Sequence, residues 1–306
     1  MRLLSLTQRA HYTLLMFNPT EIIFATTQAC NLHCPHCFVS RNPKKLDSKT
    51  AITFLESCKG TDIYKIGFSG GEPFLNLDFM LQIISWAYKN EFCFDQIMTN
   101  GDWWKTEEEL RSVLQKLQDA GYDGKIGLSY DNFHGQDFER IKVFAQAVNH
   151  IFGEESLNVQ AVADPELGDK ETEVLEKQLN ILAEDYCAEV YILPQTFQSA
   201  DSRAWQSKKW FKEDYCEGPG QILFVHATGN IAPCCGFANE NPELFIGNIS
   251  TDSFESVMKK ACENRMVNTC YNTGLLKEAK KLSKDGRLPG ITEDICSFCD
   301  WMCKNN

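Results

Sequence analysis

Several features are missing from this sequence of 306 residues, and each absence excludes a class of protein. No apolar run approaches the ~20 residues that a membrane-spanning helix needs. Lysine and arginine number 30 against 42 aspartate and glutamate residues, and the formal charge of -12 argues against non-specific binding to nucleic acid, which needs clustered basic side chains. No internal repeat of the solenoid kind is present. We therefore expect neither a membrane nor a nucleic acid as partner.

A secretory signal is also missing from the N-terminus, where Arg9 and His11 interrupt the apolar residues and no small-residue cleavage site follows. The chain nevertheless contains 14 cysteines. Because thiols persist in reducing compartments, this combination predicts a cytoplasmic protein whose cysteines bind metal. Hydrophobic residues at 43% and charged residues at 24% are ordinary values for a globular chain, long enough for one large core or a core with a smaller module.

Three of the thiols lie on one short segment, CNLHCPHC, which spans residues 30–37. The C-x3-C-x2-C spacing of Cys30, Cys34 and Cys37 makes a compact site with three thiolates. An iron-sulfur cubane normally takes four thiolates, so three of them leave one iron open to a small molecule. The alternatives are a zinc site closed by a nearby histidine, and three cysteines that share a turn without a metal.

A second segment with possible ligand contacts follows one strand later, where Gly70, Gly71 and Glu72 come directly after the apolar residues 63–68. Two glycines let the backbone approach a ligand closely and adopt positive φ, and a carboxylate beside them can accept hydrogen bonds from an ammonium group. Taken alone, this GGEP segment is equally typical of an ordinary turn between a strand and a helix.

Together, the CNLHCPHC and GGEP segments resemble the radical S-adenosylmethionine (radical SAM) superfamily. The resemblance implies a 4Fe–4S cluster on Cys30, Cys34 and Cys37, whose open iron chelates the amino and carboxylate groups of S-adenosylmethionine. Electron transfer from such a cluster cleaves the cofactor to methionine and a 5'-deoxyadenosyl radical, and an external reductant of the flavodoxin or ferredoxin type supplies the electron. It also implies that the segment Gly70-Gly71-Glu72 holds the methionine amine.

Strands and helices alternate through the first two thirds of the chain. The expected strands are residues 21–27, 63–68, 94–99, 125–130, 157–163 and 189–193, and the expected helices begin near residues 48, 77, 106, 136 and 170. Such alternation implies parallel strands with right-handed crossovers. Six strands rather than eight resemble the open partial (β/α)6 barrel of the radical SAM core, which we assign to residues 1–195. Residues 196–306 are then a linker and a small cysteine-rich α+β module that carries an auxiliary cluster.

Polar residues follow several of these strands, at the end where parallel barrels place their active sites. Asn100 and Ser129 are two of them, and the segment Ser129-Tyr130-Asp131 looks like the family's fourth-strand segment that contacts the ribose of the cofactor. By this resemblance Asn100, Ser129 and Asp131 are candidate cofactor-binding residues. Serine and aspartate at such positions also cap helices and form turns, so that alternative stays open.

A second group of cysteines lies in the last third of the chain. A hairpin is expected from residues 222–225 and 231–234, and it would bring Cys216 close to Cys234. Cys296 and Cys299 follow in C-x2-C spacing, with Cys303 after them. Helices near residues 253–266 and 273–284 would pack against this module. Four thiolates suit a fully ligated cluster, although a four-thiolate zinc site has the same ligands.

The pattern C-x12-G-x4-C followed by C-x2-C resembles the auxiliary-cluster extension called SPASM or, in its shorter form, twitch. The resemblance implies a second 4Fe–4S cluster bound by Cys216, Cys234, Cys296 and Cys299. Cys303 is the first substitute among these ligands, and Cys270 is a more distant one.

Cys235 bears on the type of reaction. Successive side chains of an extended segment point to opposite faces, so Cys234 and Cys235 are not expected to ligate one cluster together. A spare thiol near the substrate can donate a hydrogen atom to a carbon radical, because S–H bonds are weaker than most C–H bonds, and radical SAM peptide epimerases use a cysteine in this way. The alternative is a free cysteine that packs as a small hydrophobic residue.

Three functions follow from these observations. The favoured one is L-to-D epimerisation of a residue in a ribosomally synthesised peptide, with Cys235 as hydrogen-atom donor. The second is oxidative chemistry, either thioether or carbon-carbon cross-linking or dehydrogenation of a small alcohol, with the auxiliary cluster as electron acceptor. The third is a non-catalytic iron-sulfur or zinc module, which the GGEP segment argues against.

Overall fold

The strands predicted from the sequence form the centre of the molecule. The computed structural model describes residues 17–213, 215–216 and 221–305. Its nine strands form one sheet in the order β6-β5-β4-β3-β2-β1-β7-β8-β9, and the sheet is not closed. The first six are all parallel to their neighbours: β1 (Glu21–Ala25), β2 (Lys65–Ser69), β3 (Cys93–Thr99), β4 (Lys125–Ser129), β5 (Leu157–Ala163) and β6 (Glu189–Pro194). The predicted partial barrel is confirmed.

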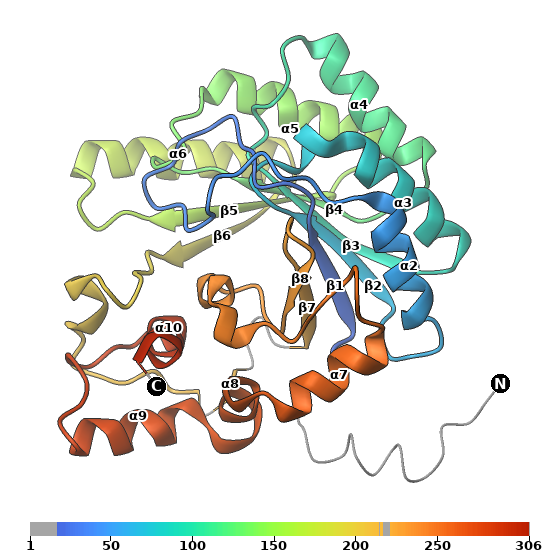
Figure 1. The fold of residues 1–306 in the computed structure, drawn as a ribbon. Helices are drawn as coiled ribbons and strands as arrows, with labels where there is room; N and C mark the ends of the chain where they lie inside the picture. Colours follow the sequence, from blue (N-terminus) through green and yellow to red (C-terminus); the bar gives the residue numbers. More distant parts are fainter. Residues whose placement is uncertain (1–16, 214, 217–220, 306) are drawn as a thin grey trace.

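Five helices cover one face of these strands (Figure 1). They are α2 (Ser48–Cys58), α3 (Leu77–Lys89), α4 (Glu107–Asp119), α5 (Phe138–Phe152) and α6 (Asp169–Asp185). Each buries an apolar stripe, and several begin at a side-chain cap: Asp47 accepts a hydrogen bond from the Thr50 amide, and Thr106 accepts one from the Glu109 amide. None of the helices in the described ranges is long and apolar enough to cross a membrane. Residues 1–16, on which the secretory-signal argument rests, lie outside the described residues.

The predicted hairpin is present, but it belongs to the barrel sheet. β7 (Ile222–Val225) pairs in parallel with β1, on the side of β1 opposite β2. β8 (Asn230–Ala232) and β9 (Gly247–Asn248) then continue the sheet with antiparallel pairs. Ile22 pairs with Leu223, and neither residue is exposed, so the hairpin closes over the free side of β1. The sheet therefore runs without a break across the boundary drawn at residue 195.

Short helices complete the C-terminal part. These are α7 (Phe254–Glu263), α8 (Arg265–Asn268), a π-helical turn (Thr269–Thr273), α9 (Leu275–Lys284) and α10 (Ile295–Asn305), with 3-10 turns at Ser202–Trp205, Phe237–Glu240 and Pro242–Leu244. A further 3-10 turn, Pro73–Asn76, lies between β2 and α3. The sequence analysis assigned no helix to the residues of α10. This helix forms because its apolar residues find partners: Phe298 packs on Phe211 and Trp210, and Trp301 packs on Trp205.

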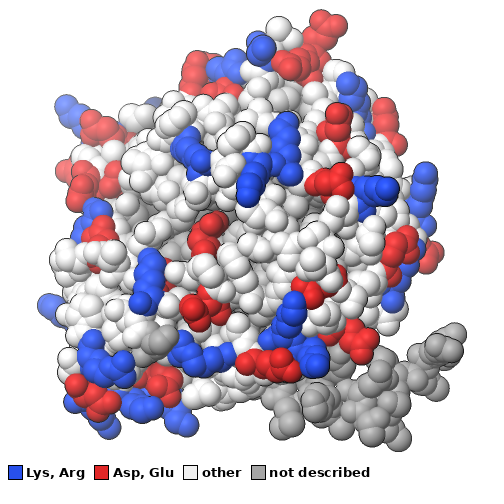
Figure 2. All heavy atoms as spheres, in the orientation of Figure 1, with Lys and Arg blue, Asp and Glu red and all other residues white. Residues whose placement is uncertain are grey.

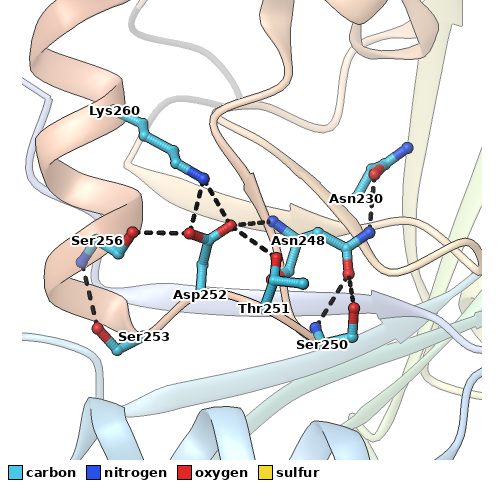
Figure 3. A network of polar contacts seen from close by, with 8 residues as sticks. All are labelled: Asn230, Asn248, Ser250, Thr251, Asp252, Ser253, Ser256 and Lys260. Atoms are coloured by element: carbon cyan, nitrogen blue, oxygen red, sulfur yellow. Dashed lines mark hydrogen bonds and ion pairs between the residues drawn. The ribbon is translucent and has the colours of Figure 1, made fainter.

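A polar network fixes strand β9 to helix α7 (Figure 3). The Asp252 carboxylate accepts hydrogen bonds from Lys260 Nζ at 2.7 Å, from Ser256 Oγ at 2.7 Å and from the Asn248 amide at 3.0 Å. Burial opposes the charge, but these donors outweigh it and lower the pKa of Asp252 to about 2. The Asn248 side chain donates to Asn230 of β8, so the network spans both antiparallel strands.

The pairing of β1 with β7 predicts that damage in the hairpin destabilises the barrel. Leu223→Ala removes a fully buried side chain, and we expect it to lower the free energy of unfolding by about 2–5 kcal/mol. Urea unfolding followed by tryptophan fluorescence measures this, because Trp86 lies in α3 and Trp301 lies in α10. The control Val174→Ala, on an exposed position of α6, should change stability by less than about 0.5 kcal/mol. A Leu223→Ala variant with unchanged stability would contradict the shared sheet.

Candidate active site

The concave side of the sheet contains a cavity of about 450 Å³. The residues that line it come from segments far apart in the sequence but adjacent in the sheet. Among them are the predicted site residues Cys30, Cys34, Cys37, Gly70, Gly71, Asn100, Ser129 and Cys235. All but Cys235 lie on or after the C-terminal ends of β1 to β4, as the rule for parallel barrels predicts.

The cysteine loop follows β1 directly and is held by its neighbours. The Thr26 amide donates to the Ser69 carbonyl at 2.9 Å, and the Thr27 hydroxyl donates to the Lys44 carbonyl at 2.8 Å. Cys30 Sγ accepts hydrogen bonds from the Leu32 amide at 3.4 Å and from Asn100 Nδ2 at 3.7 Å. Such donors stabilise negative charge on sulfur, as a metal-bound thiolate requires.

The three thiols of this loop interact electrostatically. Burial, followed by the effects of Cys37 and Cys30, raises the pKa of Cys34 to about 11. Three thiolates this close to one another need a cation to hold them in the charged form. Three sulfur donors, with N–H groups directed at one of them, fit an iron-sulfur cluster whose fourth position is open to the cavity.

The glycines after β2 let their loop approach the cysteine loop. The Gly71 amide donates to the Thr27 carbonyl at 2.7 Å, and the Glu72 amide donates to the Ala29 carbonyl at 2.8 Å. A Cβ atom on Gly70 would lie 2.5 Å from the Thr27 carbonyl oxygen, and the Gly70 φ of +144° is itself unfavourable for other residues. A Cβ atom on Gly71 would collide with the Ala29 carbonyl. Both glycines are therefore required for this contact.

Glu72 follows the two glycines and is held by several hydrogen bonds. Its carboxylate is fully buried and accepts hydrogen bonds from Thr99 Oγ1 at 2.8 Å, the Asn100 amide at 2.9 Å and the Phe74 amide at 3.2 Å. Burial raises its pKa to about 7 in spite of these donors. Glu72 is not among the residues that line the cavity, and its expected contact with an ammonium group stays a prediction. Glu72 ties the loop after β2 to the end of β3.

Asp131 is buried and is not among the residues that line the cavity, so its expected contact with the ribose stays a prediction. Oδ1 accepts hydrogen bonds from the Phe133 amide at 3.0 Å and from His134 Nδ1 at 2.7 Å, and Oδ2 accepts one from the Val162 amide at 2.9 Å. His134, which the sequence analysis missed, lines the cavity in its place. The sequence could have indicated His134 through its position three residues after Asp131. Asp131 therefore orients His134.

His36 completes this side of the cavity. Its ring lies 5.1 Å from that of His134 and 4.7 Å from that of Phe133, measured between centroids. The ligand atoms of His36, Asp131 and His134 all lie within 4.8 Å of one another. Because backbone amides already occupy both Asp131 oxygens, we describe this trio as a hydrogen-bonded wall of the cavity.

A second, smaller cavity gathers the cysteines of the C-terminal part. It is lined by Cys216, Cys234, Cys270, Cys296 and Cys299. The predicted ligands Cys216, Cys234, Cys296 and Cys299 are thus brought together, and a cavity surrounded by thiols and apolar groups fits a second cluster. Cys270, named as the more distant substitute, also lines this cavity, and its Sγ atom lies 3.9 Å from Cys299 Sγ. Cys303 lies about one turn further along α10, and its side chain interacts with that of Cys299. Which thiol replaces a predicted ligand stays a prediction.

Cys234 and Cys235 lie at different cavities. Cys234 is buried and lines the second cavity, whereas Cys235 lines the first. This is the alternation that an extended segment predicts. Water in the cavity reaches Cys235, yet the surrounding protein desolvates it, and burial together with the nearby Glu21 raises its pKa to about 12. Cys235 is therefore held as a neutral thiol.

Glu21, at the start of β1, is a second residue that the sequence analysis missed. It lines the cavity, and its Oε1 atom accepts no hydrogen bond from any described residue. Burial and the nearby Asp95 raise its pKa to about 7, and Lys65 opposes them. A Cβ atom on Gly67 of β2 would lie 3.0 Å from this oxygen, so the glycine makes room for the carboxyl group. The sequence could have indicated Glu21 because it is a charged residue at the start of an apolar strand.

Two family models match parts of the chain that carry cysteine groups. The model of the radical SAM superfamily matches residues 24–141, and that of the SPASM family, an iron-sulfur cluster-binding domain, matches residues 216–284. A "putative peptide biosynthesis protein YydG" of Bacillus subtilis (strain 168) is 24% identical over 312 residues, which cover 93% of this chain and 92% of that protein. The "uncharacterized protein MJ0907" of Methanocaldococcus jannaschii is 30% identical over 125 residues, 39% of this chain and 41% of the relative.

Among solved structures, that of native anSMEcpe with bound AdoMet and Cp18Cys peptide superposes with a TM-score of 0.60 at 14% identity. The superposition covers 93% of this chain and 95% of that one. At this identity the likeness concerns the fold, and it extends through both the barrel and the C-terminal part.

The raised pKa of Glu21 predicts a pH-dependent stability. The folded protein binds the proton more tightly than the unfolded chain, so the contribution of Glu21 is present below its ordinary pKa of 4.5 and is lost as the pH rises through about 7. We expect Glu21→Gln to gain about 1–3 kcal/mol over the wild type between pH 5 and pH 8 in anaerobic urea unfolding. Glu176→Gln, at an exposed position of α6, should follow the wild-type curve. Parallel curves for wild type and Glu21→Gln would contradict the assignment.

Proposed function

Because this chain is a radical SAM protein with a C-terminal SPASM domain, we propose that it converts an L residue of a ribosomally made peptide to its D form, with Cys235 as hydrogen-atom donor. The observation that carries this proposal is the separation of Cys234 and Cys235 between two cavities. The first thiol is available to a cluster. The second is available to a substrate.

The residues present fit the cofactors of the family, which are two 4Fe–4S clusters and S-adenosylmethionine. Cys30, Cys34 and Cys37 would hold the first cluster, and Gly70 and Gly71 line the same cavity. Cys216, Cys234, Cys296 and Cys299 would hold the auxiliary cluster. When bound, the first cluster and S-adenosylmethionine supply a 5'-deoxyadenosyl radical that removes a hydrogen atom from the substrate.

Cys235 acts after that removal. Its S–H bond breaks and a C–H bond forms on the opposite face of the substrate α-carbon, which inverts the configuration and leaves a thiyl radical on sulfur. One electron from an external reductant of the flavodoxin or ferredoxin type and one proton from water then restore the thiol. The neutral state of Cys235 suits this role, because a thiolate has no hydrogen atom to give.

A peptide substrate is supported by the relatives. The Bacillus subtilis protein is named for peptide biosynthesis, and anSMEcpe was solved with a bound peptide. The cavity of about 450 Å³ lies within the usual size range of ligand-binding sites.

The second candidate is oxidative modification, either cross-linking of a peptide or dehydrogenation of a small alcohol. Cys234 and Cys235 are adjacent in the chain, so a cluster ligated by Cys234 would lie close to the substrate cavity and would be placed to accept an electron. The two reactions differ in mass. Epimerisation leaves the mass unchanged in ordinary water, whereas cross-linking or dehydrogenation removes two hydrogens.

Iron content separates the roles of the two adjacent thiols. We expect anaerobically reconstituted wild type and Cys235→Ala to hold ~8 irons per chain, and Cys234→Ala to hold ~4. Iron and sulfide analysis with electron paramagnetic resonance measures this. A Cys235→Ala protein with ~4 irons would make Cys235 a ligand, and the oxidative reaction would become the better proposal.

Deuterium incorporation tests the reaction. Candidate substrates are peptides encoded by short reading frames beside the gene, synthesised and incubated with enzyme, S-adenosylmethionine and dithionite in deuterated water. We expect one extra mass unit per modified site and a D residue after hydrolysis. Cys235→Ala should still form 5'-deoxyadenosine but give no D residue, because its side chain has no weak X–H bond. Loss of two hydrogens from the peptide would point to the oxidative reaction instead.

A further inference from the structure

Strand β6 is an uncovered edge of the sheet. It is the outermost strand and pairs only with β5 among the described residues, as Figure 1 shows. Three consecutive large side chains are exposed on it: Tyr191 at 47%, Ile192 at 59% and Leu193 at 44%. Natural proteins usually protect such edges with charges, proline or a covering segment, because unpaired backbone groups attract other strands. Here the charged Glu189 and the proline Pro194 stand only at the two ends.

The register shows which of these side chains face the barrel interior. Tyr191 pairs with Gln160, and Leu193 pairs with Val162. Gln160 lines the main cavity, so Tyr191 and Leu193 lie on the same concave face, while Ile192 lies on the other. A strand added beside β6 would therefore direct every second side chain toward the cavity.

The end of β6 opens into the active site. A further cavity of about 270 Å³ is lined by Leu193, Pro194 and Gln195 from this end, and by His36 and Phe38 from the cysteine loop. His36 and Phe38 also line the main cavity. Figure 2 shows acidic and basic side chains scattered over this face of the molecule, with uncharged surface between them.

We propose that β6 is the docking edge for the peptide substrate, which adds an extended segment to the sheet and enters the cavity past His36 and Phe38. The proposal rests on the peptide-modifying function argued above. Backbone hydrogen bonds to β6 would supply the affinity, and apolar side chains at alternate positions would contact Tyr191 and Leu193. A single strand is the favoured occupant, because the edge ends at a cavity that takes side chains rather than at a broad flat surface.

The test measures binding and needs no turnover, so it is independent of the reaction type. Random peptides of about ten residues, the length of a long strand, are displayed and selected on the reconstituted enzyme with S-adenosylmethionine. We expect Tyr191→Lys and Leu193→Lys each to lower the affinity for the selected peptides at least about tenfold. The matched control is Val174→Lys, an apolar residue of α6 with 55% exposure, which should bind as wild type does. Formation of 5'-deoxyadenosine without peptide shows that each variant has folded and holds its cofactors.

Binding of N-methylated peptides is the second measurement. A peptide that adds to a sheet uses the N–H of every second residue, so N-methylation at alternate positions should abolish binding in one register and leave it in the other. Equal binding to wild type and both lysine variants, indifference to N-methylation, or a library that yields no binder would each overturn the proposal. Two further outcomes would also overturn it. One is a dimer of the wild type, measured by light scattering, that becomes a monomer in Leu193→Lys. The other is tighter peptide binding after deletion of residues 1–16. If binding at β6 holds while no D residue is formed, the docking edge stands and the epimerase assignment fails.

Discussion

The parallel pairing of β1 with β7 is the contact on which both cysteine sites depend. β1 carries the first cysteine loop at its C-terminal end and Glu21 at its start. β7 leads through a tight turn into β8, which ends just before Cys234 and Cys235. Because the two strands lie side by side, Cys235 is brought to the cavity that the first cysteine group borders. A C-terminal module that merely followed the barrel would have no such access.

This pairing also places the adjacent thiols of Cys234 and Cys235 at different cavities. A one-residue step along an extended chain reverses the direction of the side chain, so Cys234 and Cys235 enter different environments without any change in backbone. The environments then set their chemistry. Cys234 lies among other thiols, and Cys235 lies beside carboxyl groups that disfavour its ionisation. The raised pKa of Glu21 and that of Cys235 have one physical origin, a poorly solvated interior with an excess of acidic groups.

Much of the core and of the first site could be predicted from the sequence, because those features are local. Alternating apolar strands and capped helices gave the barrel, and the spacing of Cys30, Cys34 and Cys37 gave the first cluster site. Residues whose roles depend on tertiary partners were harder. Glu72 and Asp131 are acidic residues that follow strands, and their carboxylates accept hydrogen bonds from the amides of Asn100, after β3, and Val162, in β5. The sequence around each carboxylate does not indicate which amides will donate to it. Cys270 likewise reaches the second cavity only through the packing of the π-helical turn.

The extension of the sheet on one side explains why its other side is open. β7, β8 and β9 continue the sheet beyond β1, so the barrel cannot close by joining β1 to β6. An edge is therefore left at β6, and it is left where the cavity wall is made of β5, β6 and the cysteine loop. A substrate that is itself a polypeptide can use such an edge, because it brings the backbone groups that the edge lacks. The geometry that places Cys235 in the cavity and the geometry that leaves β6 exposed are thus consequences of the same strand order.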